Sequence, residues 1–286
     1  MFDTPQPARP GTLYIVATPI GNLRDLTLHA VDILKSVDLI AAEDTRNSQG
    51  LLSAYGIQSR LIALHEHNEA AGAMRLVADL QAGKSLAYIS YAVSCLKKKP
   101  GAKLVAAARL ADIPIVPIPG ASAVATALSV AGLEGPWLFA GFLPPKAVAR
   151  RKALEGLNAL PCALVFYEAP HRIEECVEDL AAVLGGDRTL LFARELTKRF
   201  EQIHQCHLAA APAWLAEDEN HRRGEFVLVV SAPVAEKIDD AGEARRILEV
   251  LLDELPVKQA AQLTARLTGG RKNALYDLAL ELKQEK

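Results

Sequence analysis

The chain has 286 residues, a formal net charge of −2 and 50% hydrophobic residues. This composition excludes wholesale disorder, and the near-neutral charge excludes a global positive field drawing the protein to nucleic acid or anionic lipid. The four cysteines are scattered without a CxxC pair, which indicates a reducing, cytoplasmic setting. No apolar run approaches the roughly 20 residues of a membrane span, so no membrane association is expected.

Short β-rich runs alternate with helical patterns along the first half of the chain. Residues 1–11 lack the apolar core of a signal peptide and are expected to form a flexible arm. Strands are expected at 12–17, 37–42, 60–64, 85–90 and 113–117, and helices at 25–35, 68–81, 102–111 and 122–131. This order predicts a parallel sheet with helices on both faces, in a first α/β domain of residues 12–135.

The pattern changes in the second half. Residues 141–152 hold paired prolines and four basic residues without an acid, a composition that predicts a linker. Strands are expected at 163–167, 189–193, 202–207 and 225–231, and a helix at 173–184. They predict a partly antiparallel sheet in a second α/β domain of residues 136–236. Residues 237–286 are expected to form a helical appendage that Pro256, Gly269 and Gly270 cut into short helices.

In an open α/β sheet, ligands bind at the carboxyl ends of the strands. Mostly small or polar residues follow the predicted strands at 18–22 (TPIGN), 43–46 (EDTR), 65–67 (HEH), 90–91 (SY) and 119–122 (PGAS). Such an edge suits a polar small molecule. Plainer interpretations remain. Residues 18–22 could form only a tight turn, and residues 43–46 could only cap a helix. The two histidines at 65–67 could bind a metal, but the sequence offers no third ligand nearby. No P-loop is present, and no GxGxxG follows a strand.

Several motifs follow one another in a fixed order along the chain. They are LYIVATPIGNLRDLT (13–27), AEDTR (42–46), PG (119–120), GFLP (141–144), FYEAPHR (166–172), ARELTK (193–198), GEFV (224–227) and the tail LPVKQAAQLTARLTGGRKNALYDLAL (255–280). Over residues 11–283 the chain thereby resembles the tetrapyrrole methylase-like superfamily of S-adenosylmethionine (SAM) methyltransferases. Within it, the chain is most similar to the ribosomal RNA small subunit (cytidine-2′-O)-methyltransferases.

The resemblance implies two α/β domains with a SAM cleft between them, a homodimer and no metal. It implies methyl transfer to the ribose 2′-hydroxyl of a cytidine in small-subunit ribosomal RNA, with the assembled subunit as substrate. A tetrapyrrole methylase is the alternative, although a small macrocycle needs no basic C-terminal tail.

On this basis a set of residues is expected to bind SAM. They are Pro19, Gly21, Asn22, Ser90, Ser94, Gly120, Ala121, Ser122, Phe166, Tyr167 and Glu225. Two of these, Gly21 and Gly120, would let the backbone approach the cofactor closely.

Another set holds the candidates for the chemistry. The proton acceptor is expected among Glu43, Asp44, Glu168, His171 and Glu195, whereas Arg46 and Arg172 would hold phosphate or orient those acids. The sequence does not rank the acceptors.

RNA binding must use local positive charge, because the chain as a whole is slightly acidic. One basic stretch holds Lys146, Arg150, Arg151 and Lys152, and Lys198 is a further candidate. A second stretch holds Lys258, Arg266, Arg271 and Lys272, the only charged residues between Pro256 and Tyr276. The alternatives are a solvated linker for the first stretch and a packing or dimerisation tail for the second.

One block departs from the family pattern. After the strand at 85–90 the family typically reads D-A-G-T-P-x-x-S-D-P-G, whereas residues 91–101 read YAVSCLKKKPG. The block loses two acids and a glycine, and its three lysines would put like charge near a sulfonium. The chain is therefore a weakened RNA-binding homologue, a homologue with a rebuilt loop, or a sequence with a local error or engineered change. The confinement of the changes to one block favours a local event.

Overall fold

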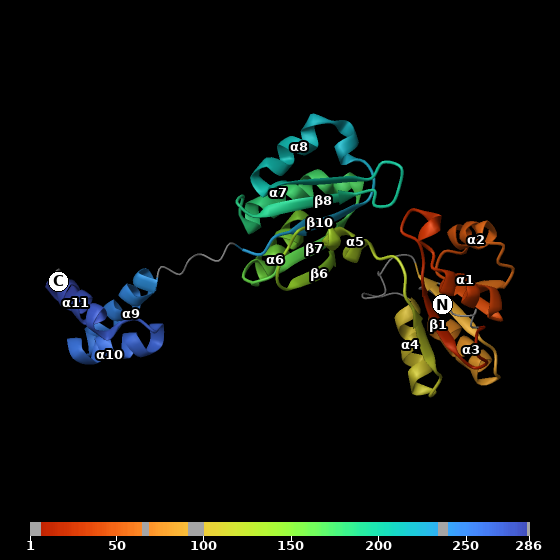
Figure 1. Ribbon diagram of the computed structural model, residues 1–286, viewed down its shortest axis with the longest axis horizontal. Coiled ribbons are helices and arrows are strands. Elements are labelled where there is room, and N and C mark those ends of the chain that lie inside the picture. The colour runs from red at the N-terminus through yellow and green to blue at the C-terminus, as the bar shows by residue number, and fades with distance from the viewer. Residues whose placement is uncertain (1–6, 65–68, 91–99, 234–239, 285–286) are drawn as a thin grey trace, which may run out of the picture. The chain divides into compact units, whose positions relative to one another are not determined.

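The computed structural model describes residues 7–64, 69–90, 100–233 and 240–284. Its contacts divide the chain into two units, Met1–Ala232 and Pro233–Lys286. The first unit contains two five-stranded sheets, and the described part of the second is helical (Figure 1).

The first sheet is parallel, with the strand order β3-β2-β4-β1-β5. Its strands are β1 (Leu13–Ala17), β2 (Leu39–Ala42), β3 (Arg60–Ala63), β4 (Leu86–Ser90) and β5 (Ile115–Ile118). The flanking helices are α1 (Leu28–Ser36), α2 (Thr45–Ala54), α3 (Glu69–Gln81) and α4 (Pro100–Leu110). One apolar cluster joins α1 and α2 to the sheet, and another joins α3 and α4, so the predicted parallel sheet with two covered faces is confirmed.

The second sheet has the order β6-β7-β10-β8-β9. Its strands are β6 (Trp137–Phe142), β7 (Ala163–Glu168), β8 (Thr189–Arg194), β9 (Gln202–His207) and β10 (Phe226–Val230). Strand β10 runs antiparallel to both of its neighbours, while β6 and β7 are parallel. The prediction of a partly antiparallel sheet is confirmed.

Helices cover the second sheet unequally. Helices α6 (Ala147–Asn158), α7 (Ile173–Leu184) and α8 (Ala211–Glu217) pack on one face. The other face packs against α5 (Ala123–Ser129), which follows the last strand of the first sheet (Figure 1). Side chains alternate between the two faces along β7. Phe166 therefore packs with helices α6 to α8, and Tyr167 packs on the face that α5 covers.

The predicted linker at 141–152 is wrong. Its first residues end β6, where Phe142 pairs in register with Tyr167, and residues from Ala147 onward form α6. The helix forms because Leu154 enters the core of the second sheet and Arg150 pairs with the buried carboxylate of Asp179 on α7. Both contacts involve residues distant in sequence, which local composition does not reveal.

The second unit holds α9 (Asp240–Glu254), α10 (Val257–Thr268) and α11 (Lys272–Gln284). Leu248, Ala260, Leu275 and Ala279 are among the residues of its small apolar core. Pro256 caps α10, and Gly269 ends it in the left-handed conformation at φ 73°. The predicted division of the tail into short helices is confirmed. Among the described residues no helix is long and apolar enough to cross a membrane.

Candidate functional site

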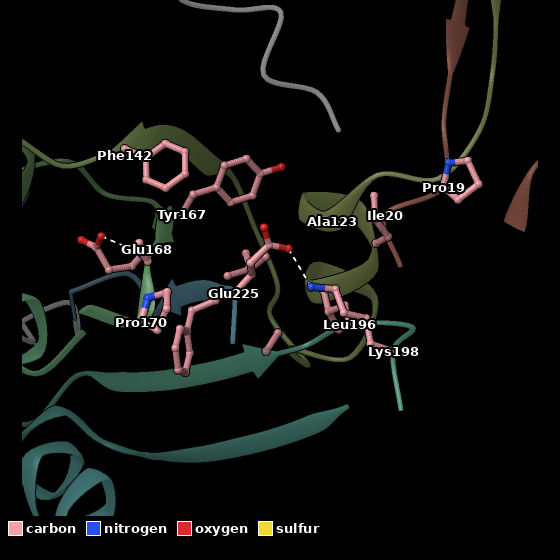
Figure 2. Close-up of a pocket in the computed structure, with 14 residues that line it drawn as sticks. Pro19, Ile20, Ala123, Phe142, Tyr167, Glu168, Pro170, Leu196, Lys198 and Glu225 are labelled. Carbon is pink, nitrogen blue, oxygen red and sulfur yellow. Dashed lines mark hydrogen bonds and ion pairs between the residues drawn. The ribbon is translucent and has the colours of Figure 1, made fainter. Parts of the chain in front are cut away.

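A cavity of about 410 Å³ opens where the turn after β1 meets the second sheet (Figure 2). Its lining residues are Pro19, Ile20, Ala123, Phe142, Tyr167, Glu168, Ala169, Pro170, Ala193, Leu196, Lys198, Glu225, Phe226 and Val227. The walls are largely apolar, and charged side chains lie at their edge. This volume and chemistry are those of a small-molecule site.

The turn after β1 is fixed against the turn after β8. The amide of Asn22 donates a hydrogen bond to Thr197 Oγ1 at 3.0 Å. A Cβ on Gly21 would lie 2.9 Å from the carbonyl oxygen of Leu196, so only glycine allows this approach. Gly21 thus admits the neighbouring turn, which closes one wall of the cavity, and its approach to the cofactor stays a prediction.

That turn after β8 is strained and highly connected. Glu195 and Thr197 both have positive φ, 51° and 62°, which is costly for residues with a Cβ. The Nζ of Lys198 donates at 2.8 Å to both Glu195 and Glu225 (Figure 2 draws the bond to Glu225). Glu195 also accepts from the amide of Glu225 at 2.9 Å. These bonds join the segment with the motif ARELTK to the segment with the motif GEFV.

The same bonds set the ionisation of this cluster. Burial alone would raise the pKa of Glu195, but hydrogen bonds from Lys198 and from the Glu225 amide outweigh it and leave that pKa below its ordinary value. Burial likewise opposes the charge of Lys198, and its two carboxylate partners reverse this and raise its pKa. Glu195 and Lys198 are therefore both charged near neutral pH.

Tyr167 presents an unsatisfied polar group at the cavity. Its side chain is only 9% exposed, and its hydroxyl has no hydrogen-bond partner among the described residues. Burial raises the pKa of this phenol, so the group is a neutral donor. Phe139 and Phe142 hold the ring edge-on, with centroids 4.8 and 5.6 Å away. Burying a hydroxyl without a hydrogen-bond partner costs folding free energy. This cost makes the Tyr167 hydroxyl a candidate for hydrogen bonding to a ligand.

Glu168 is a structural anchor more than a free base. Its two oxygens accept from the amide of Ala169 at 2.9 Å and from Arg172 at 3.3 Å, and its side chain is fully buried. Arg172 also donates to the carbonyl oxygen of Leu143 at 2.7 Å. The pair thus fastens the end of β7 to the chain after β6. His171, on the same short turn, is exposed and does not line the cavity.

The acidic segment after β2 lies apart from the cavity lining. Asp44 accepts from the amides of Arg46 and Asn47 at 2.9 and 3.1 Å and caps α2, as the plainer interpretation held. Glu43 and Arg46 are exposed. Thr45 and Arg46 border a separate shallow hollow with Leu61 and Ala63.

A family model described as tetrapyrrole (corrin/porphyrin) methylases matches residues 12–212, and one described as the RsmI C-terminal HTH domain matches residues 238–283. The ribosomal RNA small subunit methyltransferase I of Escherichia coli O157:H7 is 49% identical over 272 residues, covering 95% of each chain. The protein of the same name from Pseudomonas aeruginosa is 47% identical, covering 95% of this chain and 97% of its own. This chain belongs to the tetrapyrrole methylase family.

Solved structures of other tetrapyrrole methylases share the fold. The uroporphyrin-III C-methyltransferase of Thermus thermophilus aligns with a TM-score of 0.53 at 20% identity, covering 77% of this chain and 94% of that one. A structure of that enzyme with S-adenosyl homocysteine has a TM-score of 0.54 at 15% identity, with coverages of 77% and 97%. The cobalt precorrin-4 methyltransferase has a TM-score of 0.58 at 14% identity, with coverages of 77% and 95%.

The tetrapyrrole methylase motifs divide between cavity and framework. Pro19, Tyr167, Glu168, Glu225 and Lys198 line the cavity. Of the residues after β5, Ser122 caps α5, and Gly120 packs against Ala17 of β1. Ala121 lies between them and is not part of the lining.

The prediction for Phe166 is corrected. Its side chain is fully buried in the cluster on the opposite face of the sheet, because consecutive strand residues point to opposite sides. Ser90 is the last residue of β4, and Ser94 and the altered block 91–99 lie outside the described residues, as do His65 and His67.

The predicted RNA contacts also divide. Arg150 is 1% exposed and donates to Asp179 at 2.6 Å and to Glu175 at 3.3 Å, so its assignment to RNA is wrong. Arg151 is more exposed but also pairs with Asp179. Lys198 is held by two carboxylates. The exposed cations of the two basic stretches with no recorded ion pair among the described residues are Lys146, Lys152, Lys258, Arg266, Arg271 and Lys272.

Sequence reasoning missed part of the lining. Phe142 fell inside the predicted linker, and Ala123 and Leu196 carry no chemical signal of their own. Pairing of β6 with β7 brings Phe142 beside Tyr167, and packing of α5 on the second sheet brings Ala123 there. Among the described residues no group of three or more potential metal ligands occurs.

Proposed function

We propose that this chain transfers the methyl group of SAM to the 2′-hydroxyl of a cytidine in small-subunit ribosomal RNA. The observation that carries the proposal is the cavity of about 410 Å³, lined by segments of five of the motifs on which the resemblance to ribosomal RNA methyltransferases rests. The solved enzymes that methylate tetrapyrroles are only 14–20% identical to this chain, which supports a common fold and not a common substrate.

The residues present fit SAM on two observations. The apolar walls suit the adenosyl group, and the unpaired hydroxyl of Tyr167 offers a donor to a polar atom of the ligand. Pro19, Tyr167 and Glu225 would hold the cofactor, with the chain around Gly21, Asn22, Gly120, Ala121 and Ser122 supporting that wall. Bound SAM supplies a methyl group activated by its positive sulfur.

The protein's own part in such a reaction is positioning and exclusion of water. Methyl transfer needs the 2′-oxygen, the methyl carbon and the sulfur in line, so a rigid cavity lowers the barrier by orientation. Glu195 is a weak base because its pKa is lowered, and we assign it to holding Lys198 toward the cavity. Glu168 and Arg172 hold the β7 end in place. Glu43, Asp44 and His171 remain candidates for the proton acceptor, and Arg46 for a contact with an RNA phosphate.

We further propose a cytoplasmic homodimer that acts on the assembled small subunit. Strand β6 is an edge of its sheet and exposes three apolar side chains: Trp137 (52%), Leu138 (37%) and Phe142 (57%). A second copy covering this strand would remove that surface from water and border the cavity at Phe142. Lys146 and the four cations of the second unit are assigned to RNA phosphates.

The test is methyl transfer from labelled SAM to small subunits isolated from cells lacking the native enzyme. We expect one methyl group on a cytidine ribose, located by its resistance to alkaline hydrolysis. Gly21→Ala should reduce transfer at least tenfold, because the added Cβ collides with the Leu196 carbonyl. Gly156→Ala in α6, where a Cβ meets nothing within 4 Å, is the control and should leave transfer unchanged. Equal activity of both variants would contradict the assignment of the cavity.

The altered block at 91–99 supports a second candidate, a homologue that binds RNA but holds SAM weakly. Titration calorimetry with SAM separates the two, run beside a restored chain carrying Tyr91→Asp, Val93→Gly, Ser94→Thr, Cys95→Pro and Lys99→Asp. Equal affinity favours the active enzyme. Binding by the restored chain alone favours the weakened homologue.

A further inference from the structure

The second unit carries a surface that is both basic and aromatic. Arg266, Arg271 and Lys272 lie at or near the turn between α10 and α11. All three are exposed, and none has a recorded ion pair among the described residues. Three residues, Gly269 to Arg271, join the helices. The end of α10 and the start of α11 therefore lie together, and their cations gather at one turn.

Tyr276 lies beside Lys272. It is four residues after Lys272 on α11, so the two side chains share one face of the helix. Its side chain is 38% exposed, and no hydrogen bond or ring contact of it is recorded among the described residues. Leu275 and Ala279 face the core of the unit instead. The aromatic ring is thus partly exposed, and its hydroxyl and faces make no hydrogen bond or ring contact with the described residues.

The charges of α11 are segregated. Lys283 follows Tyr276 by seven residues and continues the row that begins at Lys272. Asp277 and Glu281 are four residues apart and form a separate row on the adjoining flank. The neighbouring helix α9 is mixed, and its Arg245 pairs with Glu249 at 3.0 Å. The face around Tyr276 is therefore the positive one, which complements a polyanion.

We propose that Tyr276 is a stacking platform for an unpaired base of the ribosomal RNA substrate, with Arg266, Arg271 and Lys272 on the flanking phosphates. Stacking on aromatic side chains combined with basic contacts to the backbone is the general mode of single-strand recognition. The inference rests on the proposed RNA substrate and gives the second unit a role in recognising a single-stranded segment near the modified cytidine.

The experiment measures fluorescence anisotropy of the full chain with a labelled single-stranded RNA of about 12 nucleotides and with a blunt duplex of the same length, since single-strand sites span about 4–16 nucleotides. Tyr276→Ala should weaken single-strand binding about tenfold, the order expected for one stacked base. It should change duplex binding less than about twofold, because paired bases do not offer a free face. Tyr276→Phe keeps the ring and should bind as the original chain does.

A matched control is Leu280→Ala, which removes another exposed apolar side chain (40%) one turn further along α11. It should leave both affinities unchanged. The inference is overturned if the original chain binds neither RNA, if Tyr276→Ala binds the single strand normally or loses both RNAs equally, or if Tyr276→Phe is as weak as Tyr276→Ala. A change in sedimentation of Tyr276→Ala with normal RNA binding would identify the face as a protein interface instead.

Methyl transfer to small subunits is measured on the same preparations. Single-strand binding that depends on Tyr276, in a chain that transfers no methyl group, would count against the proposed activity and leave the stacking role standing. Normal transfer by Tyr276→Ala with unchanged RNA affinity would overturn the stacking role alone. Circular dichroism and thermal unfolding of each variant verify that the helices remain folded.

Discussion

Two stretches of this chain look alike in sequence and differ in the structure. Residues 146–152 and 258–272 each carry four basic side chains and no acid. In the first, helix α6 packs on α7, where Asp179 pairs with Arg150 and Arg151 and Glu175 pairs with Arg150, so two of its four cations are neutralised. In the second, all four cations are exposed, without a recorded ion pair among the described residues. A run of basic residues in the sequence therefore does not guarantee unpaired cations in the fold, because acidic residues distant in sequence can pair with them.

The largest expected effect is a loss of folding stability when the buried acidic partner of the first stretch is removed. Asp179→Ala leaves Arg150 in the interior with the exposed carboxylate of Glu175 as its one remaining anionic partner among the described residues, so stability should fall by about 3–5 kcal/mol. Denaturant unfolding measures this. Glu174→Gln, which breaks the more exposed pair with Arg222, is the control and should cost much less.

A double replacement sharpens that test. Arg150→Met with Asp179→Leu substitutes apolar volume for the buried charges and should recover most of the lost stability. A double variant as unstable as Asp179→Ala would mean that shape rather than unpaired charge explains the loss.

The second stretch should respond in binding rather than in stability. Arg271→Ala should weaken binding to single-stranded ribosomal RNA fragments and lower the slope of log affinity against log salt by about 0.7, the value for one lost phosphate contact. Arg151→Ala should leave the slope unchanged, because Asp179 already neutralises that guanidinium. Equal slopes for both variants would remove the distinction between the two stretches.

The same contrast of paired and unpaired groups applies to two buried tyrosines. The hydroxyl of Tyr14 accepts a hydrogen bond from the Arg9 amide at 2.8 Å, whereas that of Tyr167 has no partner among the described residues. Tyr167→Phe should weaken SAM binding about threefold to tenfold and leave stability unchanged or higher. Tyr14→Phe should lower stability slightly and leave SAM binding unchanged. Calorimetry and thermal unfolding measure both, and reversed effects would contradict the ligand role of Tyr167.

The smallest expected effect is a pH dependence at Glu195. Its pKa is lowered in the folded protein, since the bonds from Lys198 and the Glu225 amide outweigh its burial. Its contribution to stability is therefore complete above the unfolded pKa of about 4.3 and is lost as pH falls through the lower folded value. Glu195→Gln should flatten stability against pH below about pH 5. If the rate of methyl transfer changes with pH between about pH 6 and 8, the same change should persist in Glu195→Gln. Its loss in this variant would indicate that Glu195 is the general base after all.

Much of the fold was predictable because its signals are local. Alternating β-rich and helical patterns gave the parallel first sheet, and Pro256 and Gly269 gave the helix ends of the second unit. The linker prediction failed because β6 and α6 owe their stability to β7 and α7, which lie further along the chain.

The candidate site was only partly predictable. Motifs identified Tyr167, Glu225 and Lys198, but the sequence assigned Lys198 to RNA and Phe166 to the cofactor. The alternation of side chains along β7 puts Phe166 on the far face of the sheet. Lys198 is bound by Glu195 of its own turn and by Glu225 from a distant segment. Ala123 reaches the cavity because α5 packs on the second sheet rather than on the one that precedes it.

The sequence by itself determined which elements form and which family the motifs resemble, because propensity, periodicity and short motifs act over a few residues. The tertiary structure alone decided which charges lack an ion pair, which glycine lies too close to another turn for a Cβ, and which buried tyrosine hydroxyl has no protein partner among the described residues. Pairing, burial and steric approach depend on residues far apart in the chain, as the contact of Gly21 with Leu196 illustrates.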